Sequence, residues 1–291
     1  YDASDIAKQV IRGGYDALFV DPLANTVDAR AIDIPTLLGL LRSAATRPIT
    51  VIIDGTMLPA ALPPHLFRER AATTQDIVVM YYESASKYLQ FGVEHCLAGL
   101  LLHDNRHRAS LEKYRRNIGA ILYPGAALGF PRYDREQLVT HIRAMSESAL
   151  RVASLIEQDL TSSLHLNVVY AGLPSHPDYR FTKEFVYHGG CISFAFRRQD
   201  RNSSDFLNGF IEAVLEYAND HNLAMTKGVS FGFNHVRVSA ASAIAESEWP
   251  FPRLYVCTLQ DAECRALADA FSHACVAMEN ANMLDTVCGD E

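Results

Sequence analysis

The sequence predicts an α/β protein with a mostly parallel sheet in its first half and a smaller α+β domain in its second half. Up to about residue 102, short strand-like runs that are apolar on both faces alternate with helical segments, a pattern typical of a parallel sheet covered on both faces. A long amphipathic segment then leads into a second set of strands and helices. Because 291 residues are enough for two domains, we expect one over residues 1–145 and another over residues 146–291.

The first domain is predicted to begin with a helix that has Ser4 as its N-cap and ends at Gly13-Gly14. Apolar strands are predicted at residues 17–20, 49–53, 77–82 and 95–102, with a leucine-rich helix between the first two. In parallel sheets, ligands bind beyond the carboxyl ends of the strands. Polar side chains stand at these ends here, namely Asp21, Asn25, Asp54, Glu83 and Ser84. We therefore expect a binding site at this edge of the sheet.

The second domain follows a predicted helix over residues 134–160, where apolar side chains recur at helical spacing. Beyond it we predict strands near residues 168–170, 191–196 and 254–257, and helices near residues 206–219 and 261–278. These elements indicate one antiparallel sheet with helices on one face.

Composition and charge exclude several classes of function. With 26 basic and 34 acidic residues, the net charge is −8, so no nucleic-acid partner is expected. No apolar run approaches the roughly 18 residues that span a bilayer, so no membrane partner is expected either. The six cysteines are scattered without a C-x-x-C pair, which is typical of reduced thiols in a cytoplasmic protein. His103 and His107 lie in a charged loop, so no metal site is predicted.

A lysine flanked by hydroxyl side chains follows the third predicted strand, in Ser84-Ala85-Ser86-Lys87-Tyr88. Partial burial lowers the pKa of a lysine side chain, and the neutral amine can form a Schiff base with a carbonyl. The hydroxyls of Ser84 and Ser86 can donate hydrogen bonds to a phosphate. Most lysines after strands are exposed and carry no cofactor, so this segment alone leaves both interpretations open.

An aspartate, Asp54, closes the second predicted strand. An aspartate there can bind magnesium or a ribose in a nucleotide site, but the chain has no G-x-x-x-x-G-K-[ST] segment and no G-x-G-x-x-G segment after a strand. Two interpretations remain. Asp54 is a turn or N-cap residue, or its carboxylate pairs with a protonated ring nitrogen and keeps a cofactor ring a strong electron sink.

Taken in chain order, these segments resemble the cofactor site of the Cys/Met-metabolism family of pyridoxal 5′-phosphate (PLP) enzymes, which includes cystathionine γ-synthases and methionine γ-lyases. The resembling segments are Asp21-Pro22-Leu23-Ala24-Asn25-Thr26, Asp54-Gly55-Thr56, Ser84-Ala85-Ser86-Lys87-Tyr88, Thr140-His141-Ile142-Arg143-Ala144-Met145, Gly172-Leu173-Pro174-Ser175-His176-Pro177 and Gly189-Gly190-Cys191-Ile192-Ser193-Phe194. The resemblance covers nearly the whole chain. It implies a large domain with the PLP-dependent transferase fold (aspartate-aminotransferase-like, fold type I) and a smaller α+β C-terminal domain.

The resemblance implies a role for each polar residue at the predicted cofactor site. Lys87 is the catalytic residue and forms the aldimine with PLP, while Asp54 pairs with the ring nitrogen. Asn25 touches the phenolic oxygen, and Ser84 and Ser86 hold part of the phosphate.

The substrate carboxylate calls for a planar fork of two donors, which arginine provides and lysine does not. The family has this arginine in an Ile-Arg-Leu-Ser-Val-Gly strand, and the best match here is Arg253 in Pro252-Arg253-Leu254-Tyr255-Val256. Arg237, in a second strand-like segment, remains the alternative. Ser230, in the segment that resembles the family's Ser-Leu-Gly triplet, is also predicted to bind substrate.

The sequence departs from the family pattern in three places. Phe91-Gly92-Val93-Glu94 stands where the family usually has Gly-His-Ser-Asp, so we expect a different turn beyond Lys87. The stretch after Ser230 is short and lacks the His-Pro-Ala loop. The family's N-terminal phosphate loop and ring-stacking tyrosine have no counterpart, so we expect an N-terminally incomplete cofactor domain with exposed apolar side chains near the start of the chain.

The implied function is that of a PLP-dependent carbon–sulfur or carbon–heteroatom lyase or transferase in methionine and cysteine metabolism (trans-sulfuration). Its expected substrate is a γ-substituted amino acid, and a homodimer or homotetramer with shared active sites is expected in the cytoplasm. The same site serves γ-elimination, γ-replacement and β-elimination. Val229 precedes Ser230 as in methionine γ-lyases, which favours γ-elimination. A non-catalytic homologue that keeps the fold for assembly or regulation is the alternative of a different class.

Overall fold

The computed structural model describes residues 2–58, 77–132, 134–160, 166–196, 203–241 and 250–288, the last eight of them by their backbone alone. The chain divides into two compact units. Unit 1 consists of Tyr1–Thr26, Arg30–Val139 and Arg180–Val186, and unit 2 of Val27–Ala29, Thr140–Tyr179 and Tyr187–Glu291. The predicted boundary at residue 145 lies inside helix α5 (Arg135–Leu160), which was predicted over residues 134–160.

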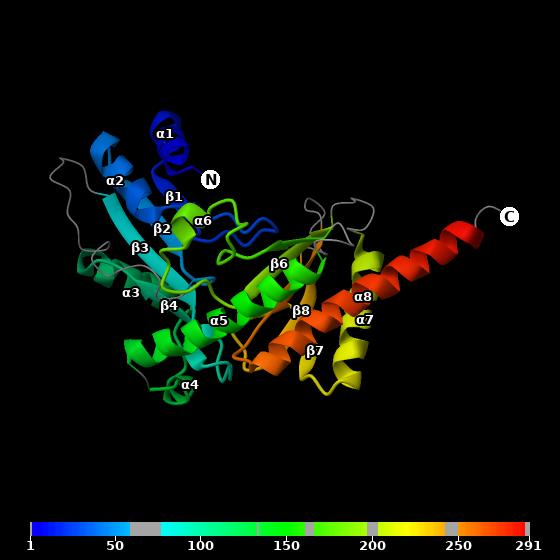
Figure 1. Ribbon diagram of the computed structural model, residues 1–291. Helices are drawn as coiled ribbons and strands as arrows, with labels where there is room; N and C mark the ends of the chain where they lie inside the picture. Colours follow the sequence, from blue (N-terminus) through cyan, green and yellow to red (C-terminus); the bar gives the residue numbers. More distant parts are fainter. Residues whose placement is uncertain are drawn as a thin grey trace. The chain divides into compact units, whose positions relative to one another are not determined.

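Unit 1 contains a four-stranded sheet in the order β1-β2-β3-β4 (Figure 1). Strands β1 (Ala17–Val20), β2 (Ile49–Asp54) and β3 (Ile77–Ser84) are parallel, which confirms the predicted mostly parallel sheet. Strand β4 (Gly99–Leu102) begins four residues later than predicted and runs antiparallel to β3. An antiparallel neighbour needs only a short connection, and residues 85–98 provide one instead of a crossover helix.

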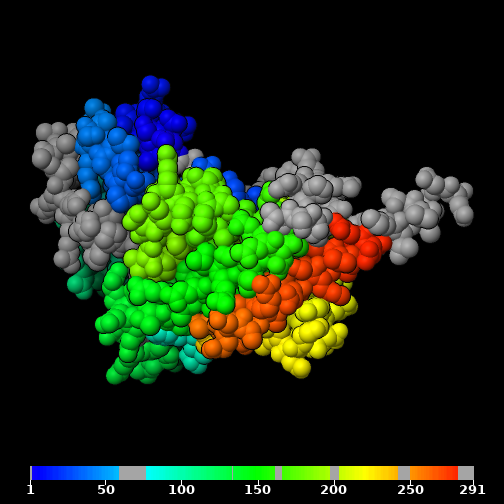
Figure 2. Space-filling model, in the orientation of Figure 1, coloured from blue at the N-terminus to red at the C-terminus, as the bar shows by residue number. Residues whose placement is uncertain are grey.

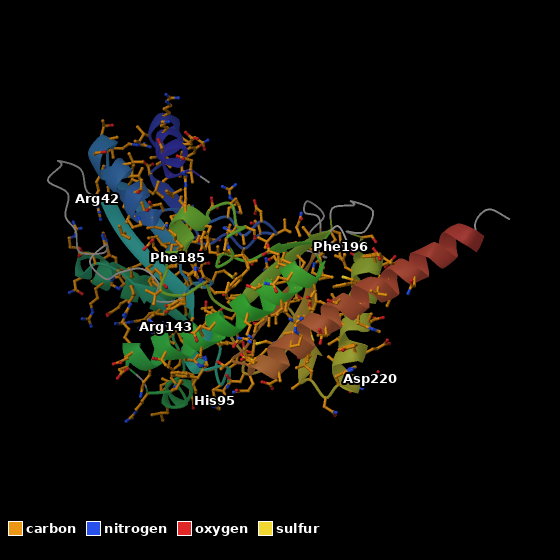
Figure 3. The ribbon with its side chains drawn as sticks, in the orientation of Figure 1. Arg42, His95, Arg143, Phe185, Phe196 and Asp220 are labelled. Carbon is orange, nitrogen blue, oxygen red and sulfur yellow. The ribbon has the colours of Figure 1, made fainter. Side chains whose placement is uncertain are left out.

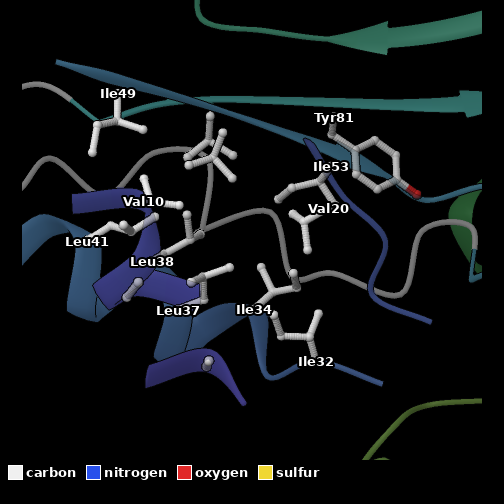
Figure 4. Packing of buried hydrophobic residues seen from close by; sticks show 14 residues of the cluster. Val10, Val20, Ile32, Ile34, Leu37, Leu38, Leu41, Ile49, Ile53 and Tyr81 are labelled. Atoms are coloured by element: carbon white, nitrogen blue, oxygen red, sulfur yellow. The ribbon is translucent and has the colours of Figure 1, made fainter. Parts of the chain in front are cut away.

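Helices α1 (Ala3–Gly13) and α2 (Ile34–Ala44) pack on one face of this sheet and form the core of unit 1 (Figure 4). Leu37, Leu38 and Leu41 on α2 are fully buried against the sheet. The prediction of Ser4 as the N-cap of α1 is wrong, because Asp2 caps the helix and accepts hydrogen bonds from the amides of Ser4 (2.7 Å) and Asp5 (3.2 Å). Asp2 has the extended backbone angles of an N-cap (φ −84°, ψ 126°), whereas Ser4 already lies inside the helix that begins at Ala3.

Strand β1 lies at an edge of the sheet. Large apolar side chains in this strand and just before it are exposed, as expected near the start of the chain. The side chain of Phe19 is 71% exposed and that of Tyr15 is 59% exposed. At the other edge, all four residues of β4 are exposed. Between β4 and α5 lie three short helices without buried residues, the 3-10 helix Asn105–His107, α3 (Arg108–Asn117) and α4 (Pro124–Leu128).

Unit 2 contains a five-stranded sheet in the order β5-β6-β9-β8-β7. The strands are β5 (Leu166–Val169), β6 (Cys191–Phe196), β9 (Phe251–Tyr255), β8 (Val236–Ala241) and β7 (Met225–Lys227). All neighbouring pairs are antiparallel except β7 with β8. The three predicted strands correspond to β5, β6 and β9, which pair antiparallel as predicted. Strands β8 and β7 were not among the predicted strands, and β7 has only three residues.

Helices α7 (Ser204–Asp220) and α8 (Asp261–Cys288) lie side by side, α8 running from orange to red along the surface in Figure 2. They pack on the face of the sheet that carries Phe194 and Phe196 (Figure 3). The ring of Phe271 on α8 lies 4.6 Å from the ring of Phe194 and 5.7 Å from the ring of Phe210 on α7, measured between centroids. This aromatic cluster confirms the predicted helical cover on one face.

Among the described residues, no helix combines the length and apolar character that crossing a membrane requires. Within the same ranges, no three His, Cys, Asp or Glu side chains come together as a set of metal ligands. The five cysteines in these ranges whose side chains are described are free thiols, and four of them are buried.

The remaining short helix, α6 (Tyr179–Thr182), follows the segment around His176. The ring of His176 lies 3.2 Å from the carbonyl oxygen of Ala29.

Candidate active site

The side chains of Asp21, Asp54 and Tyr82 lie near one another at the carboxyl ends of the parallel strands in unit 1. The strand register pairs Val20 with Ile53 and Asp54 with Tyr82, so Asp21, the residue after β1, comes next to Asp54 on the same face. This face is opposite to the one that packs against α1 and α2, because Val20, Ile53 and Tyr81 belong to that core. Asp21 and Asp54 therefore lie at the strand ends, as the sequence predicted, and their carboxylates make this edge anionic.

The carboxylate of Asp54 is half-buried and held by two donors. Its Oδ1 accepts a hydrogen bond from the amide of Thr56 at 2.9 Å, and the hydroxyl of Tyr82 forms a side-chain hydrogen bond with it. The Thr56 hydroxyl oxygen in turn accepts from the amide of Ser84 at 3.0 Å. The amide of Gly55 donates to the carbonyl of Tyr82 at 2.8 Å. The segment Asp54-Gly55-Thr56 thus fixes the end of β2 to the end of β3.

Burial and mutual repulsion shape the electrostatics of this edge. Desolvation raises the pKa of Asp21, and the nearby charge of Asp54 raises it further. Desolvation, the hydrogen bond with Asp54 and the charges of Asp54 and Asp21 together raise the pKa of Tyr82 to about 12. Since like charges disfavour a further anion, this edge suits a cationic partner such as a protonated ring nitrogen.

Lys87 lies three residues beyond the end of β3, in a tight turn that leads to the 3-10 helix Tyr88–Gln90. Its side chain is half-buried, and its amide donates to the carbonyl of Ser84 at 3.4 Å. The amide of Thr56 donates to Asp54, the amide of Ser84 donates to the Thr56 hydroxyl, and the amide of Lys87 donates to the Ser84 carbonyl, so these residues form one connected path. The structure therefore links the two residues that the sequence singled out for cofactor chemistry.

The turn beyond Lys87 is stabilised by Gln90, a fully buried residue that the sequence analysis did not identify. Its side-chain amide donates to the carbonyls of Ala85 (2.9 Å) and Cys96 (2.7 Å), and its oxygen accepts from the amide of Cys96 (3.1 Å). Phe91 and Glu94 adopt positive φ angles of 51° and 42° within this turn. The unusual Phe91–Glu94 stretch thus has its own closing contacts.

The two predicted phosphate donors differ in their surroundings. The Ser86 side chain is buried, and its hydroxyl lies 3.4 Å from the carbonyl oxygen of Cys96 and 3.2 Å from the amide of Ala98. Ser84 is half-buried at the end of β3. Asn25 is exposed in the loop after β1, which is closed by a hydrogen bond from the amide of Ala24 to the carbonyl of Arg30 at 2.8 Å.

Arg253, in unit 2, is a buried arginine with only 5% of its surface exposed. It lies on β9, opposite Ser193 of β6 and Ser239 of β8. Its Nε donates to the Ser193 hydroxyl at 3.4 Å, and its side chain forms a hydrogen bond with Tyr255. Because the helices α7 and α8 pack on the face of Phe194, these residues form a polar patch on the opposite face of the sheet.

Arg237, the alternative, lies on the neighbouring strand β8 opposite Tyr255 and is half-buried. Its Nε donates to Nε2 of His235 at 2.9 Å, and its guanidinium carbon lies 3.6 Å from the centre of the Phe233 ring. Desolvation and the charge of Arg237 lower the pKa of His235, which keeps the imidazole a neutral acceptor. Ser230 is half-buried between β7 and β8, and Val229 beside it is 75% exposed.

The side chains in unit 1 fit PLP at its carbonyl and ring ends. A carbonyl needs an amine, which Lys87 has, and a protonated ring nitrogen needs a fixed carboxylate, which Asp54 has with two donors in place. At the phosphate end, the Ser86 hydroxyl contacts the Cys96–Ala98 backbone. A phosphate there would therefore depend on Ser84 and on donors other than Ser84 and Ser86.

Comparison with known proteins agrees with this chemistry. The family described as "Cys/Met metabolism PLP-dependent enzyme" matches residues 2–217. The chain is 26% identical over 261 residues to the bifunctional enzyme flvA of Aspergillus flavus, covering 88% of this chain and 30% of that protein. It is 24% identical over 254 residues to methionine gamma-lyase of Arabidopsis thaliana, covering 85% of this chain and 51% of that protein. The chain thus spans about a third of the first relative and about half of the second.

Among solved structures, cystathionine gamma synthase from Xanthomonas oryzae pv. oryzae is similar with a TM-score of 0.69 and 16% identity. The match covers 92% of this chain and 66% of that one. A likeness at this identity concerns the fold alone. It confirms the predicted type I fold of PLP-dependent transferases.

Proposed function

Because the chain belongs to the Cys/Met metabolism PLP-dependent enzyme family, we propose that it acts on a γ-substituted amino acid, sulfur-containing or similar, by γ-elimination or γ-replacement. The observation that supports this most is the hydrogen-bonded path from the Asp54 carboxylate through Thr56 and Ser84 to Lys87. It brings the main chain of Lys87, the residue that supplies an amine, and the carboxylate of Asp54 to one edge of one sheet, and the chemistry of PLP requires an amine and a carboxylate.

Bound PLP supplies an electron sink that weakens the bonds at the α-carbon of an amino acid. In this proposal Lys87 attaches the cofactor, and its amine, once released by the substrate, accepts the proton from the α-carbon. Asp54 would hold the proton on the ring nitrogen, Asn25 would contact the phenolic oxygen, and Ser84 would contact the phosphate. Ser86, also predicted to hold the phosphate, would have to give up its hydrogen bond to the Cys96 carbonyl to donate to it. A cytoplasmic homodimer or homotetramer with shared active sites remains part of the proposal. The engagement of Ser86 with the Cys96–Ala98 backbone supports phosphate donors from a neighbouring subunit.

We assign the substrate carboxylate to Arg253 rather than Arg237, with Ser230 as a further substrate contact. Arg253 is buried beside two serines and a tyrosine, an environment that holds a guanidinium fork in one orientation. The guanidinium group of Arg237 donates to His235 and stacks on the ring of Phe233, so it is already engaged by residues other than a substrate carboxylate.

Arg253→Lys is expected to raise KM for the amino acid about 30-fold, with kcat lowered less than fivefold, because a bidentate charge-assisted contact is worth about 2 kcal/mol more than a single one. Steady-state kinetics would measure this, with Arg237→Lys as the matched control and thermal unfolding to check the fold. A larger rise in KM for the Arg237 variant would reverse the assignment.

A substrate panel tests the reaction itself. The PLP-loaded protein would be incubated with methionine, cystathionine and O-acylated homoserine and scored for 2-oxo acid, ammonia and replacement products. Exposed Val229 beside Ser230 leads us to expect 2-oxo acid and ammonia from a γ-substituted substrate. Cleavage of cystathionine at its β-carbon to pyruvate, ammonia and homocysteine, with no product from methionine or O-acylated homoserine, would indicate β-elimination. A colourless protein with no absorption change on borohydride treatment would indicate a non-catalytic homologue.

A further inference from the structure

We propose that Tyr82 is a positioning residue for Asp54, fixing its carboxylate from the neighbouring strand so that it can meet a cationic ring nitrogen. The role of Asp54 toward the cofactor rests on the proposed function. The contact between Tyr82 and Asp54 does not, and it can be tested in the cofactor-free protein. The sequence analysis did not single out Tyr82.

The register of the sheet places Tyr82 directly beside Asp54. The two residues are partners in the parallel pairing of β2 with β3, and their side chains leave the sheet on the same face. The hydrogen bond from the amide of Gly55 to the carbonyl of Tyr82 holds this register at the strand end. Tyr82 is 36% exposed, so its ring borders the open side of the candidate site.

The donors around Asp54 leave room for one more partner. An ionised carboxylate has about four lone-pair positions. The amide of Thr56 donates to Oδ1, and the phenol of Tyr82 interacts with the same carboxylate from the neighbouring strand. Both donors are neutral, so they fix the orientation of the carboxylate without cancelling its charge. A protonated ring nitrogen therefore meets a pre-oriented anion, which is the arrangement that gives a strong charge-assisted hydrogen bond.

The charges nearby explain why a phenol suits this position. Asp21 and Asp54 both face the Tyr82 hydroxyl, and both disfavour an additional negative charge. Their effect, after desolvation, raises the pKa of Tyr82 to about 12. The phenol thus stays protonated at neutral pH and remains a donor. A lysine or arginine here would pair with Asp54 and compete with the ring nitrogen, whereas phenylalanine would leave the carboxylate with one donor fewer.

The first test uses the cofactor-free protein and follows tyrosine ionisation by ultraviolet absorption. Subtracting the titration of Tyr82→Phe from that of the unsubstituted chain isolates one of 13 tyrosines. We expect its midpoint near 12, and in the Asp54→Asn background we expect it to fall by about one pH unit or more, because an anionic acceptor is replaced by a neutral one. Tyr15→Phe, which removes an exposed phenol, is the control for the subtraction.

The second test measures the dissociation constant of PLP in a double-mutant cycle. Tyr82→Phe is expected to raise this constant about tenfold, the effect of one hydrogen bond to a charged group. In the Asp54→Asn background the same substitution should change it less than about twofold, because the two residues act as one unit. The absorption band of the bound cofactor should also shift its pH dependence in Tyr82→Phe and not in Tyr15→Phe.

The two tests separate the inference from the proposed function. A protein that binds no PLP, yet loses the high Tyr82 midpoint in Asp54→Asn, would overturn the proposed function and keep the Tyr82–Asp54 contact. An unchanged Tyr82 midpoint in Asp54→Asn, or additive effects of the two substitutions on the PLP dissociation constant, would overturn the positioning role. The titration in Asp54→Asn leaves Tyr82 in place, so the proposal remains falsifiable if Tyr82→Phe fails to fold.

Discussion

Lys87→Ala is expected to abolish turnover and the covalent attachment of PLP while leaving the fold intact. A Schiff base requires the amine, and alanine has none. The same amine is the proposed base for the α-proton, and removal of a general base alone typically costs about 10²- to 10⁴-fold in rate. Borohydride reduction followed by peptide mass spectrometry would locate the cofactor on the Lys87 peptide of the unsubstituted protein and on no peptide of the variant.

The stability of the variant should change little, because Lys87 is only half-buried and stands in a turn whose closing contacts come from Gln90 and Ser86. Lys8→Ala is a matched control, since Lys8 is an exposed lysine of unit 1 paired with Asp5 at 3.2 Å. It should retain full activity and cofactor binding. Turnover by Lys87→Ala within tenfold of the unsubstituted protein would falsify the assignment of Lys87.

The parallel strands of unit 1 were predictable because each is a continuous apolar run that ends in a polar residue. Ile49–Asp54 and Ile77–Ser84 differ from the predicted ranges by one and two residues at their ends. Strand β4 was harder, since His95–Leu102 is equally apolar but its first four residues belong to the turn that Gln90 closes. The orientation of β4 depends on that turn, and a buried glutamine gives no periodic signal in the sequence.

The candidate site was predictable at the level of strand ends and not at the level of contacts. Asp54 and Lys87 stand out because polar residues follow apolar runs. The contribution of Tyr82 depends on the register between β2 and β3, which a one-residue shift would turn to the other face. The engagement of Ser86 with the Cys96–Ala98 backbone depends on a turn of 10 to 12 residues that the sequence pattern does not specify. Side-chain partners across strands therefore had to come from the structure.

The sheet of unit 2 shows a second reason why the sequence pattern did not predict every strand and its contacts. Strand β8 (Val236–Ala241) reads Val-Arg-Val-Ser-Ala-Ala, and its polar residues argue against a strand covered on both faces. In the structure Val236, Val238 and Ala240 face the helices, while Arg237 and Ser239 join Arg253 and Ser193 on the opposite face. A polar face within a largely buried sheet is expected where a ligand binds, and it favours the assignment of the substrate carboxylate to this sheet.

Asp54→Asn is expected to keep PLP bound and to lose about 10³-fold in kcat, because a charge-assisted contact to the group that accepts electrons in the transition state is removed. Asparagine has nearly the same shape, and its side-chain oxygen still accepts from the amide of Thr56, so the connection from β2 to β3 should survive. What it cannot do is stabilise a positive charge on the ring nitrogen. The loss should therefore fall on kcat, while KM and thermal stability change little.

The control for this substitution is Asp16→Asn. It removes the same single negative charge from an exposed aspartate of unit 1, which pairs with Arg47 at 3.0 Å. Its activity should match that of the unsubstituted protein. The absorption spectrum of bound cofactor provides a readout independent of turnover, since loss of the ring proton should change the spectrum in Asp54→Asn and leave it unchanged in Asp16→Asn. If Asp54→Asn turned over substrate within threefold of the unsubstituted protein, Asp54 would be a turn residue that ties β2 to β3, and the partner of the ring nitrogen would have to be sought elsewhere.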